Sequence, residues 1–195
     1  MRQRPLAWGM ELRLVLCRTG DLAAADKHAI TTLCSRAFHE DFSSLFTYIT
    51  DCAHLLAYLD GPSSPAADDD GDLVGHASWS TRWLQPESED APLRTAYVDA
   101  VATDPAFWGC GVGSAVMTRF AAETQDFTLD GLSTTVEGFY APLGWERWRG
   151  QTAMRAADGL VYTPNECVMI LRTPLTPPLD LDALLTVEPR GGQPW

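Results

Sequence analysis

The sequence predicts a single α/β domain in which a mixed, mostly antiparallel sheet is flanked by helices. The chain has 195 residues, of which 46% are hydrophobic and 21% charged, the size and composition of one globular domain. Between residues 54 and 103, apolar runs are separated by polar turns, which is typical of an antiparallel meander. After Pro105 the apolar residues recur at the spacing of a helix.

The N-terminal part predicts a strand followed by a helix. Residues 10–17 form the expected strand because turn residues follow them, and Asp21 is expected to cap the helix. The helix runs to about Phe38 with one buried face, which consists of Leu22, Ala25, Ala29, Ile30, Leu33, Cys34 and Ala37. A loop follows at residues 39–42, and periodicity leaves open whether residues 45–49 form a second helix or an irregular lid.

The central part predicts the meander. Its expected strands are residues 54–60, 73–84 and 93–103. The loop between the first two strands carries Asp68, Asp69 and Asp70, which could hold a divalent cation. Because the spacing of an EF-hand loop is absent, a solvated acidic turn is favoured and no metal site is predicted.

The C-terminal part predicts the elements that close the domain. In chain order, we expect a helix at residues 112–123, a strand at 126–134, a helical turn at 136–140 and closing strands at 144–154 and 168–171. Residues 173–195 are rich in proline and are expected to form a tail, and residues 1–9 are expected to be flexible. One domain is therefore expected over residues 1–195.

The charge and the cysteines restrict the function and the compartment. Twenty-six acidic and fourteen basic residues give a formal net charge of −12, which disfavours nucleic acids and anionic membranes and favours a cationic small molecule. The five cysteines show neither a C-x-x-C pair nor a His/Cys ligand spacing, so neither a disulfide framework nor a zinc site is predicted. No apolar run reaches the roughly 18 residues of a membrane helix, and residues 1–9 lack the apolar centre of a signal peptide. We expect a soluble, cytoplasmic protein.

The most informative segment joins the strand at 93–103 to the helix at 112–123. Its glycines, Gly109, Gly111 and Gly113, leave backbone N–H groups unshielded at a helix N-terminus, where the helix dipole adds positive character. The segment therefore predicts a site for a pyrophosphate or a similar anion. A dinucleotide-binding βαβ unit is disfavoured because the loop follows a meander, and a Walker A loop would need Gly-Lys-Ser or Gly-Lys-Thr.

Residues 108–113, Trp-Gly-Cys-Gly-Val-Gly, resemble the acetyl-CoA signature of the Gcn5-related N-acetyltransferase (GNAT) superfamily. That signature commonly reads Arg-Gly-x-Gly-x-Gly or -Ala, so Trp108 replaces the arginine. The order of the expected elements also resembles the superfamily as far as about residue 172. The resemblance implies splayed fourth and fifth strands, acetyl-CoA as cosubstrate and no metal. It implies cofactor contacts from Val101, Trp108, Gly109, Cys110, Gly111, Val112, Gly113 and Ser114.

Further segments resemble the aminoglycoside 2′-N-acetyltransferases within that superfamily. They are residues 37–42 (Ala-Phe-His-Glu-Asp-Phe), 97–102 (Tyr-Val-Asp-Ala-Val-Ala), 132–133 (Leu-Ser), 140–145 (Tyr-Ala-Pro-Leu-Gly-Trp) and 190–195 (Arg-Gly-Gly-Gln-Pro-Trp). This resemblance implies direct transfer of an acetyl group to the 2′-amino group of an aminoglycoside, an activity of antibiotic resistance, and it allows a homodimer.

The resemblance also assigns catalytic roles by position. The backbone N–H of Val101 would face the thioester carbonyl, Asp99 would take a proton from the substrate ammonium directly or through a water, and Tyr140 would protonate the departing thiolate. The residues alone leave other interpretations open: Val101 as a core valine, Asp99 paired with Arg94, and Tyr140 as an aromatic filling a gap. A covalent acetyl-Cys110 route is disfavoured because no histidine is placed in the sequence to activate that thiol.

A cationic substrate requires several carboxylates. The resemblance implies that Asp41, Asp99, Glu166 and the α-carboxylate of Trp195 bind the ammonium groups, with residues 173–195 folding back toward the substrate. Gln193 stands where the family often has an acid. Two alternatives stay open: a different cationic amine, such as a polyamine or a protein N-terminus, and acyl-CoA binding without turnover, because Trp108 removes a phosphate contact.

Overall fold

The computed structural model describes residues 11–60, 72–190 and 195. The expected flexible segment at 1–9, the acidic turn at 68–70 and Gln193 lie outside these residues. By its internal contacts the chain divides into two compact units, which are described separately. Unit 1 comprises Met1–Trp79 and Asp99–Phe120, and unit 2 comprises Ser80–Val98 and Ala121–Trp195.

Unit 1 contains an antiparallel set of strands. β1 (Glu11–Arg18) pairs with β2 (Ala53–Asp60), and β2 pairs with the first part of β3 (Asp72–Pro86). The register between β2 and β3 shifts between Ala57 and Tyr58, which marks a β-bulge. The expected first strand and the first hairpin of the meander are thus confirmed.

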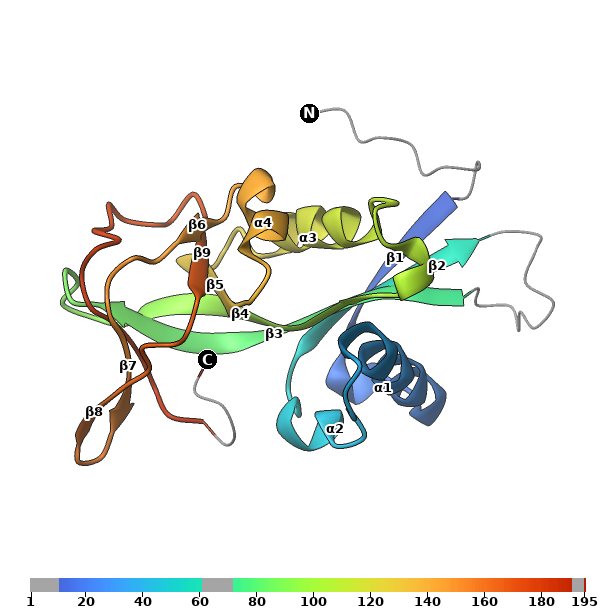
Figure 1. Cartoon of the computed structure of the whole chain (residues 1–195), viewed down its shortest axis with the longest axis horizontal. Helices are drawn as coiled ribbons and strands as arrows, with labels where there is room; N and C mark the ends of the chain where they lie inside the picture. Colours follow the sequence, from blue (N-terminus) through green and yellow to red (C-terminus); the bar gives the residue numbers. More distant parts are fainter. Residues whose placement is uncertain (1–10, 61–71, 191–194) are drawn as a thin grey trace. The chain divides into compact units, whose positions relative to one another are not determined.

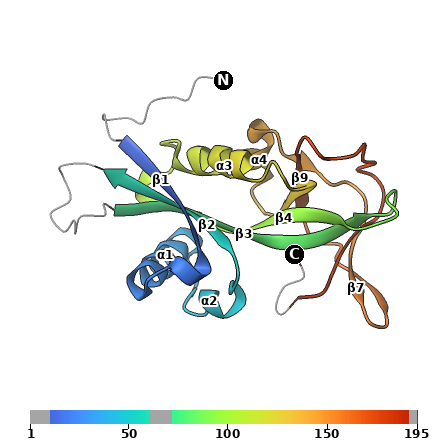
Figure 2. The ribbon, with the colours of Figure 1, turned by 180° about the vertical axis from the view of Figure 1, so that it is seen from behind.

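Helices cover both faces of these strands (Figures 1 and 2). α1 (Ala24–Phe38) and the short α2 (Leu45–Tyr48) lie on one face, and α3 (Val112–Glu123) lies on the other. The segment whose structure periodicity left open therefore contains a helix. Beneath α1 and α2 lies an apolar cluster, whose buried members are Leu22, Ile30, Leu33, Cys34, Leu45, Ile49, Cys52, Leu56 and Ala102.

The prediction that Asp21 caps α1 is wrong. Its carboxylate instead accepts a hydrogen bond from the backbone N–H of Arg18 (3.3 Å) within a short 3₁₀ turn, η1 (Thr19–Asp21). The carboxylate of Asp26 accepts from the N–H of Ala23 (2.9 Å), the N-cap residue just before α1. The helix therefore starts two residues later, and an acid inside its first turn stabilises the N-terminus.

Unit 2 contains a mixed sheet in the order β6-β9-β5-β4-β3-β10-β7-β8. The pairs β4–β5 and β7–β10 are parallel, whereas β5–β9, β6–β9, β3–β10 and β7–β8 are antiparallel. The strands are β4 (Leu93–Thr103), β5 (Leu129–Ser133), β6 (Glu146–Arg147), β7 (Thr152–Ala156), β8 (Gly159–Tyr162), β9 (Val168–Arg172) and β10 (Leu185–Val187). The expected class, an α/β fold with a mixed and mostly antiparallel sheet, is confirmed.

The expected single strand at residues 144–154 is divided into β6 and β7. Between them the backbone N–H groups of Arg149 and Gly150 both donate to the carbonyl of Leu181 (2.9 Å each) rather than to a strand. A Cβ on Gly150 would lie 1.9 Å from the carbonyl oxygen of Ala183, so only glycine permits this approach. The indole of Trp148 donates to the same Ala183 carbonyl (2.8 Å).

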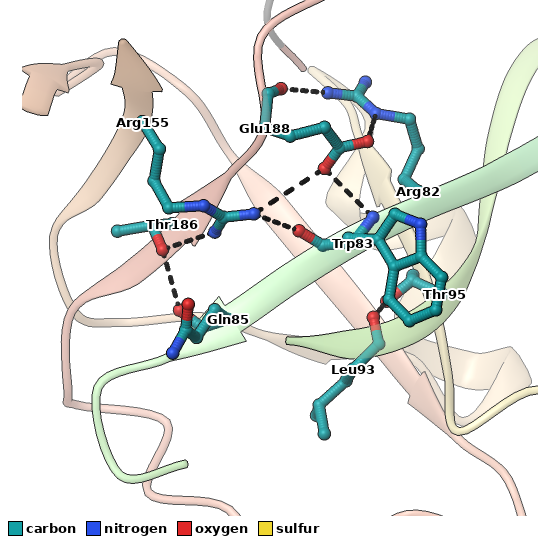
Figure 3. A network of polar contacts seen from close by, with 8 residues as sticks. All are labelled: Arg82, Trp83, Gln85, Leu93, Thr95, Arg155, Thr186 and Glu188. Atoms are coloured by element: carbon teal, nitrogen blue, oxygen red, sulfur yellow. Dashed lines mark hydrogen bonds and ion pairs between the residues drawn. The ribbon is translucent and has the colours of Figure 1, made fainter. Parts of the chain in front are cut away.

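Residues 173–195 do not form only a tail, because they contain β10. This strand lies between β3 and β7 in unit 2 and is fixed by a network of polar contacts (Figure 3). Arg82 donates through Nε to the Glu188 carboxylate and through a terminal nitrogen to the Glu188 carbonyl, both at 2.8 Å. Arg155 donates to the hydroxyl of Thr186 and to the carbonyl of Trp83, both at 2.7 Å.

Within the described residues, none of the helices has the length and the apolar character needed to span a membrane.

Candidate active site

The glycine loop, residues 108–113, follows β4 in unit 1, and its last two residues, Val112 and Gly113, are the first two of α3. Gly109 and Gly111 have φ values of 77° and 92°, in the left-handed region that favours glycine. A Cβ added at either position would meet nothing within 4 Å, so open space borders the loop. Helical bonding begins with the N–H of Ala115, which donates to the Gly111 carbonyl (2.9 Å), and the N–H groups of the first turn precede it. The residues present therefore fit a bound anion such as the pyrophosphate of acetyl-CoA.

Trp108 connects the glycine loop to β4. Its indole N–H donates to the carbonyl of Thr103 (2.9 Å), while 57% of the residue is exposed. The same loop is fixed by Asp104, which accepts from the N–H of Ala106 (2.9 Å) and forms an ion pair with Arg36 of α1. The indole of Trp108 thus attaches the start of the glycine loop to the last residue of β4. The Cys110 thiol contacts the Trp108 carbonyl (3.8 Å).

β4 carries a conformational irregularity at Ala100, between the two catalytic candidates Asp99 and Val101. Ala100 has a φ of 52°, a left-handed conformation that costs a non-glycine residue about 1–2 kcal/mol. Side chains of β3 bond to the carbonyls on this stretch: Ser78 donates to Asp99 (3.1 Å) and His76 lies 2.9 Å from the Ala100 carbonyl oxygen. Asp99, Ala100 and Val101 are all partly exposed.

In unit 2 the pairing of β4 with β5 is short, which agrees with the splayed fourth and fifth strands that the resemblance implied. The parallel ladder begins with Thr95 opposite Leu129 and ends with Tyr97 opposite Gly131. Both strands continue beyond the last pair. The ladder therefore stops before β4 reaches Asp99.

Tyr140 ends α4 (Glu137–Tyr140) in unit 2 and is 5% exposed. Its ring packs edge-on against Trp145, with centroids 5.7 Å apart, and against Phe139 at 4.8 Å. Burial raises the pKa of its phenol to about 12. Tyr140 therefore keeps its proton at neutral pH.

Glu166 and Trp195 meet at Thr163, in the connection between β8 and β9. The indole N–H of Trp195 donates to the Thr163 hydroxyl (2.7 Å), and the backbone N–H of Glu166 donates to the Thr163 carbonyl (3.2 Å). The Glu166 carboxylate accepts from the hydroxyl of Ser133 on β5 (2.6 Å). The indole of Trp195 is buried in the apolar cluster of unit 2, so this residue returns to the body of that unit.

Asp41 lies in unit 1, in the loop after α1, and is exposed. Its carboxylate accepts from the N–H (2.8 Å) and the hydroxyl (3.0 Å) of Ser43, and the backbone hydrogen bond from Ser43 is the main cause that lowers its pKa. Asp41 is thus a fixed negative charge on the surface of its unit. Arg94, the alternative partner considered for Asp99, contacts the carboxylate of Asp126 (3.3 Å) in unit 2.

The candidates fall into two sets. Unit 1 brings the β4 irregularity and the glycine loop together through the contact of Trp108 with Thr103, and it also holds Asp41. Unit 2 brings Glu166 and Trp195 together at Thr163, and it also holds Tyr140.

Sequence reasoning missed two buried histidines of unit 1, His54 on β2 and His76 on β3 (both 0% exposed). Their rings are in hydrogen-bond contact, with Nδ1 of His54 3.0 Å from Nε2 of His76. In the folded register of β2 and β3, His54 lies opposite Ser78 and His76 opposite Leu56, which places both histidines on one face.

Comparisons with known proteins show the family to which this chain belongs. The model of the Acetyltransferase (GNAT) family matches residues 27–144. An aminoglycoside 2′-N-acetyltransferase of Mycolicibacterium fortuitum is 29% identical over 198 residues, covering 98% of this chain and 96% of that protein.

Solved structures share the fold at low identity. A GNAT family N-acetyltransferase from Escherichia coli in complex with CoA matches with a TM-score of 0.56 and 15% identity over 91% of each chain. A protein of unknown function from Enterococcus faecalis, a probable N-acyltransferase, matches with a TM-score of 0.54 and 15% identity over 72% of this chain. The chain spans only 33% of the length of that second structure. Because the family match covers more than half of the sequence, this chain belongs to the GNAT family of acetyltransferases.

Proposed function

We propose that this GNAT acetyltransferase transfers the acetyl group of acetyl-CoA to the 2′-amino group of an aminoglycoside. The observation that carries the proposal is the 29% identity, over 98% of the chain, to an aminoglycoside 2′-N-acetyltransferase. The net charge of −12 supports it, because an acidic protein attracts a polycationic sugar.

Three carboxylates and the C-terminus are proposed to bind the ammonium groups of the substrate. They are Asp41, Asp99, Glu166 and the α-carboxylate of Trp195. The hydrogen bond from Ser133 fixes the rotamer of Glu166, and the burial of the Trp195 indole fixes the position of the residue that carries the terminal carboxylate. Carboxylates held in this way lose less side-chain entropy when they bind a cation, so each charge-assisted hydrogen bond contributes more.

The attack requires a neutral amine and a polarised thioester. In this proposal the Asp99 carboxylate takes a proton from the substrate ammonium, directly or through a water. The amine nitrogen then forms a bond to the carbonyl carbon, and the negative charge that develops on the carbonyl oxygen is stabilised by the backbone N–H of Val101. The left-handed turn at Ala100 separates these two groups along β4.

Collapse of the tetrahedral intermediate breaks the carbon–sulfur bond and releases the CoA thiolate; the nitrogen, which still carries its second proton after the attack, loses it to water, and the thiolate takes up a proton from solvent. Tyr140 is proposed to donate its phenolic hydrogen toward that sulfur. Its pKa of about 12 lies above the value of about 8.5 for an ordinary thiol, so complete proton transfer from Tyr140 to the thiolate is uphill. We therefore assign Tyr140 a hydrogen bond to the departing sulfur, which stabilises the transition state.

The proposal is tested by thiol release from acetyl-CoA with a panel of aminoglycosides that carry an amino or a hydroxyl group at the 2′ position. Turnover confined to the 2′-amino compounds is expected, with a product whose mass increases by one acetyl group. Turnover of both sets, or of polyamines and peptide N-termini instead, would reassign the acceptor. Tight acetyl-CoA binding without thiol release on any amine would indicate a binding module.

A further inference from the structure

A chain of hydrogen bonds, buried except for its last bond, crosses unit 1 and ends on β4. It begins at Thr19, whose hydroxyl oxygen is 2.9 Å from Nε2 of His54. Nδ1 of His54 is 3.0 Å from Nε2 of His76, and Nδ1 of His76 is 2.9 Å from the carbonyl oxygen of Ala100. All four ring nitrogens therefore have a partner, and both histidines are fully buried.

The positions of the hydrogens follow from the last acceptor. A carbonyl oxygen can only accept, so Nδ1 of His76 must carry the hydrogen that it donates to Ala100. In a neutral ring Nε2 of His76 then accepts, which requires a hydrogen on Nδ1 of His54. Nε2 of His54 accepts in turn, so the Thr19 hydroxyl gives its single hydrogen to this nitrogen at 2.9 Å and not to the Cys52 carbonyl, which lies 3.2 Å away. Burial favours this neutral state, since it lowers the pKa of His54 to about 4 and that of His76 to about 3.

The hydrogen-bonded chain from Thr19 through His54 and His76 to Ala100, which we call the relay, ends at a residue with an unusual backbone conformation. Among the described residues, two that are not glycine have a positive φ: His39, where α1 ends, and Ala100 within β4. The relay ends in a hydrogen bond to the second of these residues, Ala100. An apolar pair would fill the same volume without desolvating two imidazoles, so packing alone does not explain histidine at both positions.

We propose that His54 and His76 are positioning residues, which hold the Ala100 carbonyl and thereby the orientation of the peptide that joins Ala100 to Val101. That peptide contains both the carbonyl bonded by His76 and the N–H of Val101, so fixing one end of the planar group fixes the other. This inference rests on the proposed role of the Val101 N–H in stabilising the thioester oxyanion. Ser78, which donates to the Asp99 carbonyl, fixes the preceding peptide in the same way.

The test compares two amide substitutions of His76. In His76→Asn the side-chain amide nitrogen lies close to the position of Nδ1, so the hydrogen bond to the Ala100 carbonyl is kept. In His76→Gln the longer side chain carries the amide nitrogen toward His54, so the Ala100 carbonyl loses its hydrogen-bond donor. Leu56→Ala is the matched control, because Leu56 lies opposite His76 in the register and is buried but takes no part in the relay. One readout needs no acceptor amine: the amide resonance of Val101 in protein labelled with ¹⁵N-valine.

We expect His76→Gln to move the Val101 resonance and to lower kcat by about tenfold or more, with the KM for acetyl-CoA changed less than about threefold, because a misdirected oxyanion donor affects the transition state. His76→Asn and Leu56→Ala should leave the resonance and kcat close to wild type, even where they lower the melting temperature. Equal behaviour of the Asn and Gln variants, or an unmoved Val101 resonance in His76→Gln, would overturn the proposal.

A measurement on the wild-type protein tests the proposal even if the variants do not fold. Long-range ¹H–¹⁵N spectra of the histidine rings report the tautomers, and both His54 and His76 are expected to carry hydrogen on Nδ1. Hydrogen on Nε2 of His76 alone would overturn the relay. If the wild-type protein acetylates no amine at all, the proposed function fails, whereas the tautomers and the Val101 resonance still decide the inference about the histidines.

Discussion

Gly75 on β3 and Val112 at the start of α3 are in such close contact that a Cβ built on Gly75 would lie 2.7 Å from Cγ1 of Val112. The same Cβ would lie 3.0 Å from the Cβ of Ala57 on the neighbouring strand. The absence of a side chain at Gly75 therefore determines how closely the first turn of α3 approaches the strands of unit 1. Because the glycine loop leads directly into that turn, Gly75 also fixes the loop.

Gly75→Ala should accordingly weaken both the fold and cosubstrate binding. We expect a loss of about 1–3 kcal/mol in the free energy of unfolding, since the added methyl group overpacks the site, and a higher KM for acetyl-CoA. Gly20→Ala is the control, because a Cβ at Gly20 meets nothing within 4 Å. Urea unfolding and initial rates measure the two effects, and equal stability of the two variants would contradict the argument.

Tyr140→Phe should lower kcat by about 10²-fold with little change in KM, the size expected when one group that donates a proton or hydrogen bond in the transition state is removed. The ring packing against Trp145 and Phe139 remains, so the melting temperature should change little. Tyr162→Phe serves as control, because Tyr162 is exposed on β8. A Tyr140→Phe enzyme that turns over at the wild-type rate would show that Tyr140 does not stabilise the departing thiolate.

Asp130 on β5 should make the protein less stable as the pH rises from about 4 to 8. Its side chain is almost fully buried, and burial raises its pKa from 3.8 to about 8, although a hydrogen bond from Thr124 (3.0 Å) opposes the shift. Between these pH values the folded state binds a proton that the unfolded state has lost, so stability falls by about 1.4 kcal/mol per pH unit.

Asp130→Asn should remove this slope, because the amide oxygen still accepts from Thr124 and no proton is exchanged. Unfolding in urea at pH 5, 6.5 and 8 measures the difference between the two proteins. Asp158→Asn, an exposed residue in the β7–β8 turn, should leave the slope unchanged. The same slope in the Asp130→Asn protein would assign it to another group.

The histidine pair should act with the opposite sign at acidic pH. The pKa of His54 is lowered from 6.5 to about 4 by burial and by the charge of Lys27, so below pH 6.5 the unfolded state binds protons that the folded state excludes. Stability should fall by about 3 kcal/mol for His54 alone as the pH drops from 6.5 to 4. Cys34, the titratable group of α1 beside His76, has a pKa of about 12 and stays neutral in this range. Titration of the ring resonances checks the expectation, and an ordinary pKa near 6.5 would contradict it.

The C-terminal carboxylate can be tested apart from the indole that precedes it. Amidation of Trp195 by protein ligation removes the negative charge while the indole stays bonded to Thr163 and packed in its cluster. Aminoglycoside binding should weaken by about 1–3 kcal/mol, whereas acetyl-CoA binding and the melting temperature should hold. Trp195→Phe, which retains the carboxylate but loses the bond to Thr163, should show the reverse pattern. An unchanged aminoglycoside affinity after amidation would remove Trp195 from the site.

The elements that the sequence predicted correctly are those with a clear local pattern. β3 and β4 consist of long apolar runs ended by turn residues. In the glycine loop, the spacing of the glycines itself indicates where the backbone needs the conformational freedom of glycine. β8 was missed because all four of its residues are exposed, so no alternation marks it. β10 has three residues and is stabilised by partners about a hundred positions away in the sequence, such as Gln85 for Thr186.

In the candidate site, too, features with a local sequence pattern were predictable and features that depend on the folded chain were not. The left-handed Gly109 and Gly111 were predictable from residue type, whereas the left-handed Ala100 was not, because alanine has no preference for that conformation. His54 and His76 each stand alone in an apolar strand, and a single polar residue forms no motif. Their partnership depends on the alignment of β2 with β3, which is a property of the folded chain.

The position of β10 has a kinetic consequence. Its hydrogen bonds to β3 close a loop of about a hundred residues, as the separation of 101 between Thr186 and Gln85 shows, whereas β7 and β8 meet through a short turn. Contacts that close long loops form late, since their entropy cost is met before they contribute any stability. Until β10 arrives, β3 and β7 each present an unpaired edge to solvent, and such edges associate with other chains. Arg82 and Arg155, which both contact Glu188, hold β10 between β3 and β7 in the folded protein and so keep these two edges covered.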